Sequence, residues 1–529
     1  MKLKHIGKKQ GGFAMPTVLA FIIIAGILSG VVLEVIFTNL TIVSRNIQSQ
    51  QAFNIAEAGV NYYLWHLSHN PNDFQDGTGG PSTPDASLGY GPYTHNYVDD
   101  NAINQGTFTL WVKPAGSGST IVTIRSIGKI KNSDVVRTVE ARIGATSFAS
   151  YGVVSDSALW FGNTESANGA VHSNQGVRMD GASNADVTSA NATYVPSNQL
   201  GGDGQSHPGV WCKSSVTSPV DCNSRPKSDW HYPVTSVDFN QVTGSLCTIK
   251  KTAFASDSAT ASYADQSNAC SLAPSTRTAA YLPQRSPAAS YNPSRGYLIS
   301  LNQNGTYDLS YVNNEVDYRT PYTSALTLQS IATGITIPTS GVIYAEDNLW
   351  VRSATNFDGR LTIGAGRLNK TSRDANITIV GNLLYHAKDG SDAIGLVAEN
   401  SVYIAPYAPP ASGSFNYEID AAIIAITGSV EYPGVYNSRS WACTRGWVNS
   451  NQTFTFYGSV ATRQTWTWTW LQGNSACGDA AYDATNGYVS GIEHNATQYD
   501  TNLLYAPPPH FPITGGYMIL NWREVLTRP

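Results

Sequence analysis

Two successive hydrophobic patterns near the N-terminus both predict helix. Residues 13–33 form an apolar run without a formal charge, and as a helix this run would span roughly 30 Å, the thickness of a bilayer core. Apolar side chains then recur every three or four residues at Leu40, Val43 and Ile47. After a polar break the same spacing resumes at Phe53, Ala56, Val60, Leu64 and Leu67. Asn70-Pro71 ends the pattern because the residue before a proline disfavours helix. We expect one helix over 13–69, transmembrane at 13–37 and amphipathic beyond.

The period changes to two after a glycine- and proline-rich stretch at 70–91. Apolar and polar residues alternate over 107–113, 120–126 and 135–143, and Gly116-Ser-Gly-Ser separates the first two runs. Such runs around glycine turns predict antiparallel strands. We expect a small β-sheet head at 70–147 that lies on the amphipathic half of the helix.

Residues 148–190 and 341–529 have a third rhythm, in which short apolar runs end at glycine or asparagine. Examples are Gly169-Ala-Val-His-Ser-Asn and Ile377-Thr-Ile-Val-Gly-Asn. Glycine and asparagine tolerate left-handed corners, so the rhythm is typical of a right-handed parallel β-helix, or solenoid. An ordinary β-sandwich is the structural alternative. The predicted fold class is α+β: a long N-terminal helix, a small antiparallel sheet and a large all-β solenoid-like domain.

The cysteines fall in three neighbouring pairs without the close spacing of a zinc or redox motif. The pairs are Cys212 with Cys222, Cys247 with Cys270, and Cys443 with Cys477. Disulfides are the default in an exported domain, and sequence alone leaves every other connectivity and free buried thiols open. Two pairs fall within residues 191–340, which we expect to be a loop-rich insertion.

The composition agrees with export. Only 13% of the residues are charged, aromatic residues reach 11%, and the formal net charge is −5. A cytosolic protein usually has about twice that charged fraction. Lysine and arginine do not cluster as a nucleic-acid-binding surface requires, so we predict no specific nucleic-acid partner.

A basic leader with Gly11-Gly12-Phe13 precedes the apolar run; its lysines are Lys2, Lys4, Lys8 and Lys9. The arrangement resembles the prepilin leader of type IV pilins and type II secretion pseudopilins. The resemblance implies a cut after Gly12, by a prepilin peptidase that then methylates Phe13. Most pilins have glutamate as the fifth mature residue, and here Thr17 stands there, which suggests a minor or tip subunit. The alternative is an uncleaved signal-anchor helix.

The segment from Ala52 to Val60 reads Ala-Phe-Asn-Ile-Ala-Glu-Ala-Gly-Val. It is similar to a block of the PilX-type minor pilins, whose head sheet often precedes a large C-terminal addition. The resemblance implies that Thr17, Glu34 and Glu57 take part in filament packing. An ordinary solvated helix charge is the alternative for Glu57.

Catalysis is not expected. His172, Asp180 and Asp186 form the one cluster that resembles the acidic sites of β-helix polysaccharide enzymes, but such residues beside glycine and asparagine more often cap turns. Calcium is a possible ligand at Asp73 and Asp76, or at a second loop that contains Asp483 and Asn486. Neither loop has the ligands of a known calcium site, so we predict no cofactor.

Trp466, Trp468 and Trp470 alternate with threonines. In a strand the three indoles would share one face. If that face is exposed, it forms an aromatic platform that could bind sugar rings or another surface. If it is covered, the tryptophans belong to the core.

The sequence therefore predicts a PilX-like minor pilin with an enlarged β-helical head. It would be a single-pass inner-membrane protein and then part of an extracellular type IV pilus, with a role in assembly and surface attachment. The expected partners are other major and minor pilins, the prepilin peptidase, the inner-membrane assembly platform, membrane lipid and host or surface glycans. The alternatives are a membrane-anchored envelope protein that binds or degrades polysaccharide, and a type II secretion pseudopilin.

Overall fold

The computed structural model describes residues 14–70, 73–78, 83–114, 121–162, 165–197, 200–213, 227–285, 292–315, 326–370, 375–405, 407–408, 415–432, 452–464, 466–471, 488–492 and 495–526. These residues fall into two compact units. Unit 1 contains the described residues of Met1–Pro114, Val122–Ile143 and Ile519–Pro529. Unit 2 contains those of Ala115–Ile121 and Gly144–Met518.

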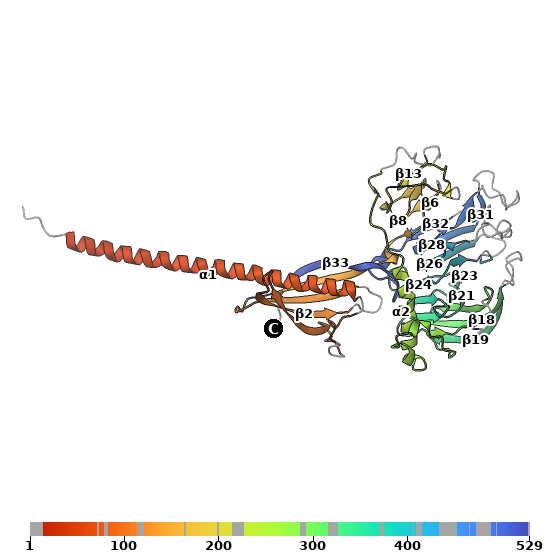
Figure 1. Cartoon of the computed structure of the whole chain (residues 1–529), viewed down its shortest axis with the longest axis horizontal. Helices are drawn as coiled ribbons and strands as arrows, with labels where there is room; N and C mark the ends of the chain where they lie inside the picture. Colours follow the sequence, from red (N-terminus) through yellow and green to blue (C-terminus); the bar gives the residue numbers. More distant parts are fainter. Residues whose placement is uncertain are drawn as a thin grey trace, which may run out of the picture. The chain divides into compact units, whose positions relative to one another are not determined.

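Unit 1 consists of one long helix and one sheet (Figure 1). The helix, α1 (Ala14–His69), is continuous. The strands of the head sheet follow the order β1-β2-β3-β4-β33, and β2 pairs antiparallel with both β1 and β3. Their bounds are β1 (Tyr90–Val98), β2 (Asn104–Lys113), β3 (Ile121–Ile130), β4 (Val136–Ser147) and β33 (Ile513–Val525). The predicted long N-terminal helix is confirmed.

The second half of α1 packs on the head sheet. Its buried apolar residues are Ala52, Ile55, Ala56, Val60, Tyr63 and Leu67, which lie three or four positions apart and so share one face. Two glycines permit a close approach: a Cβ on Gly59 would lie 2.9 Å from the Phe108 ring, and a Cβ on Gly128 would collide with the backbone of Ala52 and Ala56.

The C-terminal part of the last strand, β33, belongs to unit 1. The sequence predicts one domain over 341–529, whereas Ile519–Pro529 lies in unit 1 and β33 extends the head sheet beside β4. Ion pairs hold this strand: Arg137 binds Glu524, and Arg523 lies 2.7 Å from Glu140. The prediction was wrong here because strand pairing between residues so far apart in the chain has no local signature in the sequence.

Unit 2 is a large β-rich domain built on parallel sheets. The strands of its main sheet follow the order β15-β11-β8-β5-β28-β26-β24-β22-β20-β16, with β32 also paired to β28, and the pairs in this order are parallel. Their bounds are β5 (Val153–Ser155), β8 (Val171–Ser173), β11 (Val187–Ser189), β15 (Trp230–His231), β16 (Tyr281–Leu282), β20 (Val342–Ala345), β22 (Arg360–Ala365), β24 (Ala393–Ala398), β26 (Phe415–Ala425), β28 (Gln452–Thr462) and β32 (Asn495–Tyr499).

A second sheet of unit 2 follows the order β19-β18-β17-β21-β23-β25-β27-β29. The pairs from β17 to β29 are parallel, and β17, β18 and β19 are antiparallel. The bounds are β17 (Gly296–Asn302), β18 (Thr306–Glu315), β19 (Leu326–Thr336), β21 (Asn348–Ser353), β23 (Ile377–Ile379), β25 (Val402–Ile404), β27 (Val430–Glu431) and β29 (Trp466–Thr467).

Smaller sheets complete unit 2. Strands β6, β9 and β14 pair in parallel, as do β7 and β10, while β12 with β13 and β30 with β31 are antiparallel. The bounds are β6 (Leu159–Phe161), β7 (Ser166–Ala167), β9 (Val177–Met179), β10 (Ala182–Ser183), β12 (Thr193–Tyr194), β13 (His207–Pro208), β14 (Val210–Trp211), β30 (Thr469–Leu471) and β31 (Tyr488–Gly491).

The chain enters the main sheet at β5, in its interior rather than at an edge. It continues outward to β15, reappears at the opposite edge as β16, and returns strand by strand to β28, the other neighbour of β5. Apolar side chains in register form a buried column across this junction: Ile343, Ile363, Leu396, Ile423, Val460, Val153, Val171 and Val187. Burial of this column stabilises the contact between two segments that lie far apart in the sequence.

Residues 191–340 are more than the predicted loop-rich insertion. They contribute β14, β15, β16 and β17 to the parallel sheets. They also contain α2 (Gln241–Ala255), whose apolar side packs against main-sheet residues including Tyr344, Val397 and Ile424. The partly alternating strand β18 and the helix show ordinary local patterns, but short flanking strands such as β15 and β16 carry too few residues to predict.

Candidate functional site on the N-terminal helix

The first half of α1 carries most of the large hydrophobic side chains that are exposed among the described residues. Residues 15–47 are all exposed, among them Phe21, Ile22, Ile27, Leu28 and Phe37. A soluble monomer rarely leaves so large a contiguous apolar surface in water. The helix is long and apolar enough to cross a membrane.

A polar stripe interrupts this apolar surface. It consists of Gly30, Glu34, Thr38, Thr41 and Arg45, which lie three or four positions apart and therefore share one helix face. They line a shallow groove on α1. The Thr38 hydroxyl donates to the Glu34 carbonyl and the Thr41 hydroxyl to the Phe37 carbonyl, both at 2.8 Å. The hydroxyls are thus satisfied within the helix, whereas both charged groups of the stripe point outward.

The polar stripe continues into the face that the head sheet covers. The next positions on this face are Gln48 and Ala52. The Ser133 hydroxyl donates to Gln48 Oε1 at 3.2 Å, and Ala52 is fully buried. One helix face therefore contacts the protein's own sheet in its second half and is open in its first half.

The other predicted filament-packing residues lie elsewhere on α1. Thr17 is exposed near the start of the helix, and Glu57 is half-buried, two residues before Gly59. Gly12 and Phe13, the predicted processing residues, lie outside the described residues.

The loop after α1 was considered above as a possible calcium site, but its two aspartates contact histidines of the protein. Asp73 Oδ2 lies 3.1 Å from His66 Nε2, and Asp76 Oδ2 lies 2.7 Å from His95 Nε2. Burial would raise the pKa of Asp73, but amide donation from Gln75 and Gly77 and the nearby His66 outweigh it and lower that pKa.

The described residues contain no group of three histidine, cysteine or acidic side chains placed to bind a metal. The second possible calcium pair, Asp483 and Asn486, lies outside them.

Of the two alternatives for the tryptophans, Trp466 and Trp468 follow the second, because both belong to the core. Trp466 and Trp468 are only 8% and 2% exposed. The ring centroid of Trp466 lies 5.0 Å from that of Phe161, and the centroid of Trp468 lies 5.5 Å from that of Phe454. Trp466 continues a buried column of the second sheet, because it pairs with Val430. The Trp470 side chain lies outside the described part of the structure.

The suspected catalytic cluster is not assembled. His172 is buried on β8, where Nδ1 lies 2.8 Å from the Thr188 hydroxyl and Nε2 lies 3.0 Å from Asn174 Oδ1. Asp180 forms a 2.6 Å ion pair with Arg178, and Asp186 lies 3.8 Å from His231. Each member therefore has separate structural partners.

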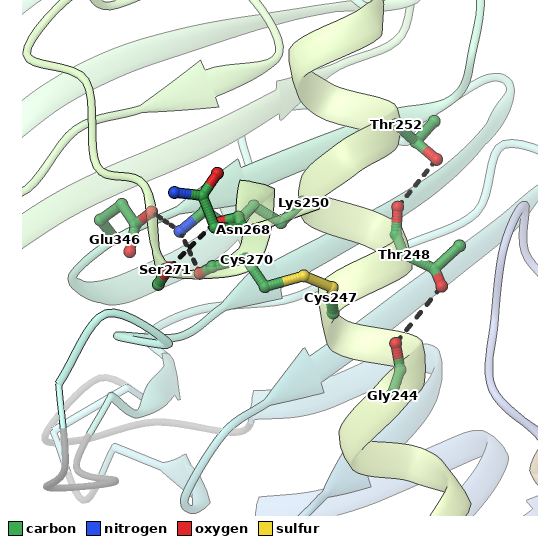
Figure 2. The surroundings of a disulfide bond; sticks show 9 residues. All are labelled: Gly244, Cys247, Thr248, Lys250, Thr252, Asn268, Cys270, Ser271 and Glu346. Atoms are coloured by element: carbon green, nitrogen blue, oxygen red, sulfur yellow. Dashed lines mark hydrogen bonds and ion pairs between the residues drawn. A yellow bond between two sulfur atoms is a disulfide. The ribbon is translucent and has the colours of Figure 1, made fainter. Parts of the chain in front are cut away.

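Both cysteines of one predicted pair, Cys247 and Cys270, are among the described residues, and they form a disulfide. Cys212 is also disulfide-bonded, whereas Cys222, Cys443 and Cys477 lie outside the described residues. Figure 2 shows that the Cys247–Cys270 bond joins α2 to the following turn and that Lys250 extends from α2 to Glu346.

Lys250 Nζ also donates to the Cys270 carbonyl at 2.9 Å. Burial raises the pKa of Glu346 and lowers that of Lys250, while their mutual attraction opposes both shifts. The disulfide and this ion pair both hold α2 in place.

Arg45 was not among the predicted site residues, although it is the next charged residue after Glu34 on α1 and lies three helix turns from it. The Lys250–Glu346 ion pair had no signal in the sequence, since its members come from elements distant in the chain.

No protein-family model matches the chain, and no curated protein matches it. Among solved structures, the chain is similar to the crystal structure of the competence-associated pilin ComZ from Thermus thermophilus, with 12% sequence identity and a TM-score of 0.30. The alignment covers 91% of this chain and 98% of that one. A TM-score this low carries no argument about function.

Proposed function

We propose that this chain is a PilX-like minor subunit of a type IV pilus. One observation carries the proposal: a single continuous helix has an exposed apolar first half and a second half that packs on its own sheet. Such a helix has one part for a bilayer or a fibre core and another part for a globular head. The prepilin-like leader at residues 1–12 and the Ala52–Val60 block support the same role.

In this proposal the chain first spans the inner membrane through residues 13–37. The prepilin peptidase cuts after Gly12 and methylates Phe13, and the assembly platform then adds the subunit to the extracellular pilus beside major and minor pilins. The neutral Thr17 favours a place at or near the tip. Unit 2 is a β-solenoid that enlarges the head and is available for surface attachment, without a catalytic role or a cofactor. Because Trp466 and Trp468 are buried, attachment uses other residues.

Mass spectrometry of sheared filaments tests the proposal. We expect a peptide from this chain that begins at methylated Phe13. Gly12→Val should block the cut and remove the protein from filaments, whereas the control Gly7→Ala should leave both unchanged. An intact Met1 or Lys2 start in the membrane fraction, with no protein in filaments, would show a fixed membrane anchor instead.

A further inference from the structure

Lys250 and Glu346 are in contact in the interior of unit 2. The lysine lies on α2 and the glutamate directly follows β20 (Figure 2). Their side chains are 0% and 1% exposed. The ring centroids of Phe254 and Tyr344 lie 5.7 Å and 5.6 Å from Lys250 Nζ, so aromatic rings flank the amine. The Cys270 carbonyl accepts a hydrogen bond from Nζ at 2.9 Å and holds the amine against the carboxyl.

The two oxygens of the Glu346 carboxyl have different surroundings. Oε1 contacts Lys250 Nζ and accepts a hydrogen bond from the Tyr281 hydroxyl at 3.1 Å. Oε2 is buried too, and among the described residues it has no hydrogen-bond partner. A buried carboxylate needs hydrogen bonds to compensate its charge, whereas a neutral carboxyl carries a proton of its own. The surroundings therefore favour the neutral acid, with its hydroxyl at Oε2.

Burial disfavours the charged forms of both groups. It raises the pKa of Glu346 to about 7 and lowers the pKa of Lys250, although the attraction between the two groups opposes both shifts. The charge of the buried Glu399 raises both pKa values. Transfer of one proton across the contact converts the ion pair into a neutral amine and a carboxylic acid. A desolvated neutral lysine is a nucleophile, so the contact holds the two reactants of amide formation.

The Lys388–Asp420 pair of the same unit lacks this chemistry. Lys388 Nζ lies 2.8 Å from Asp420 Oδ1, but the lysine side chain is 39% exposed. Partial burial lowers its pKa, whereas hydrogen bonds to Asp420 and Glu418 outweigh that effect and raise the pKa. Lys388 therefore remains an ammonium group, which has no lone pair for attack.

We propose that Lys250 and Glu346 become joined by an amide bond once unit 2 has folded. The lone pair of Nζ attacks Cδ of Glu346, and the Tyr281 hydroxyl donates to Oε1 as negative charge develops there. The Cδ–Oε2 bond then breaks, and Oε2 leaves as water with its own proton and one proton from the amine. The reaction uses no further reactant, because the fold itself holds the amine against the carboxyl.

The amide is a second covalent link of α2. The Cys247–Cys270 disulfide joins the helix to the following turn, whereas the amide joins it to the main sheet at the end of β20. A reductant opens the first link and leaves the second intact. Until the amide forms, the two groups hold each other as an ion pair. The inference concerns unit 2 alone and does not depend on assembly into a pilus.

Mass spectrometry of the full-length wild-type protein, with its disulfides reduced, tests the bond. We expect a mass lower by one water molecule than that of the chain from its measured N-terminus. Trypsin should release a branched peptide that joins the segments of Lys250 and Glu346 and is uncut after Lys250. Separate peptides for the two residues would overturn the proposal. A water loss confined to one unbranched peptide would overturn it as well, because that loss has another origin.

Three variants assign the chemistry. Lys250→Arg keeps the positive charge but removes the attacking amine, so its mass should show no loss of water. Lys388→Arg is the matched control and should still lose one water molecule. Tyr281→Phe keeps the ring and removes the donor to Oε1, so the fraction of newly made protein that is linked should fall at least about tenfold.

A loss of water in Lys250→Arg would overturn the assignment of the amine. Wild-type linking in Tyr281→Phe would overturn the role of the hydroxyl. Unlinked wild-type protein in filaments would refute the amide bond and leave the pilin proposal standing.

Discussion

In the first half of α1, the apolar side chains and the charged residues Glu34 and Arg45 are exposed. In unit 2, apolar side chains pack together in a core, and buried charged groups form ion pairs within the unit. In unit 2, Lys250 pairs with Glu346, Arg178 pairs with Asp180 at 2.6 Å, and Lys388 Nζ lies 2.8 Å from Asp420 Oδ1. Apolar columns in register fill the interior of its sheets.

The two regions differ in whether the chain itself supplies the environment that their side chains need. Unit 2 satisfies its buried charges internally, as a stable domain must. The first half of α1 has the helical hydrogen bonds but lacks an environment for its side chains, and in the proposed function the membrane and then neighbouring subunits supply that environment. Changes in the two regions should therefore affect different properties: folding in unit 2 and association in α1.

The largest contrast should come from removing one charge in each region. Lys250→Met leaves the Glu346 carboxyl buried beside Tyr281 without its cation, which should reduce the free energy of unfolding by about 3–5 kcal/mol. Glu34→Gln should leave that free energy unchanged. Urea unfolding of the full chain in detergent, followed by tryptophan fluorescence, measures both changes.

Lys251→Met is the matched control for Lys250→Met, because Lys251 is only half-buried on the same helix and its loss should cost less than about 0.5 kcal/mol. Equal effects of the two lysine variants would show that the buried pair does not stabilise unit 2.

A smaller contrast involves two glycines of unit 1. A Cβ at Gly128 would collide with the backbone of Ala52 and Ala56, so Gly128→Ala should loosen the contact between α1 and the sheet and cost about 1–3 kcal/mol. Gly30→Ala meets no neighbouring atom and should stabilise the helix by up to about 1 kcal/mol. Hydrogen exchange of the amides of residues 52–67 measures the change.

Faster exchange is expected in the Gly128→Ala variant alone. If both alanine variants gave wild-type exchange, the second half of α1 would not pack on the sheet as closely as the structure shows.

The sequence was sufficient to predict those helices and strands whose pattern depends on residues close together in the chain. The apolar run and the three-to-four spacing predicted α1, and the short runs in Val171–Ser173 and Ile377–Ile379 predicted buried strands. The pairing of β5 with β28, and of β33 with β4, joins segments hundreds of residues apart and was not predictable from periodicity. For the same reason alternation placed Trp466 and Trp468 on one face without indicating that Phe161 and Phe454 pack against these indoles.

The smallest expected difference between the two regions is in how their stability changes at acidic pH. Burial lowers the pKa of His172 on β8 despite its hydrogen bond to Asn174, whereas an unfolded histidine has a pKa of about 6.5. Between the folded and unfolded pKa values the unfolded chain binds more protons, so unit 2 should lose stability as the pH falls below about 6.5. His172→Gln should remove part of this loss, and only part, because burial also lowers the pKa of His510.

The exposed His69 of α1 provides the control, since His69→Gln should leave the acid sensitivity of unit 2 unchanged. Urea midpoints of the full chain at pH 7.5 and pH 5.5 measure the difference for each variant. A wild-type pH dependence in His172→Gln would mean that this histidine does not contribute to the acid sensitivity. A reduced dependence in His172→Gln alone would locate the acid response in the buried strands of unit 2 rather than at the end of α1.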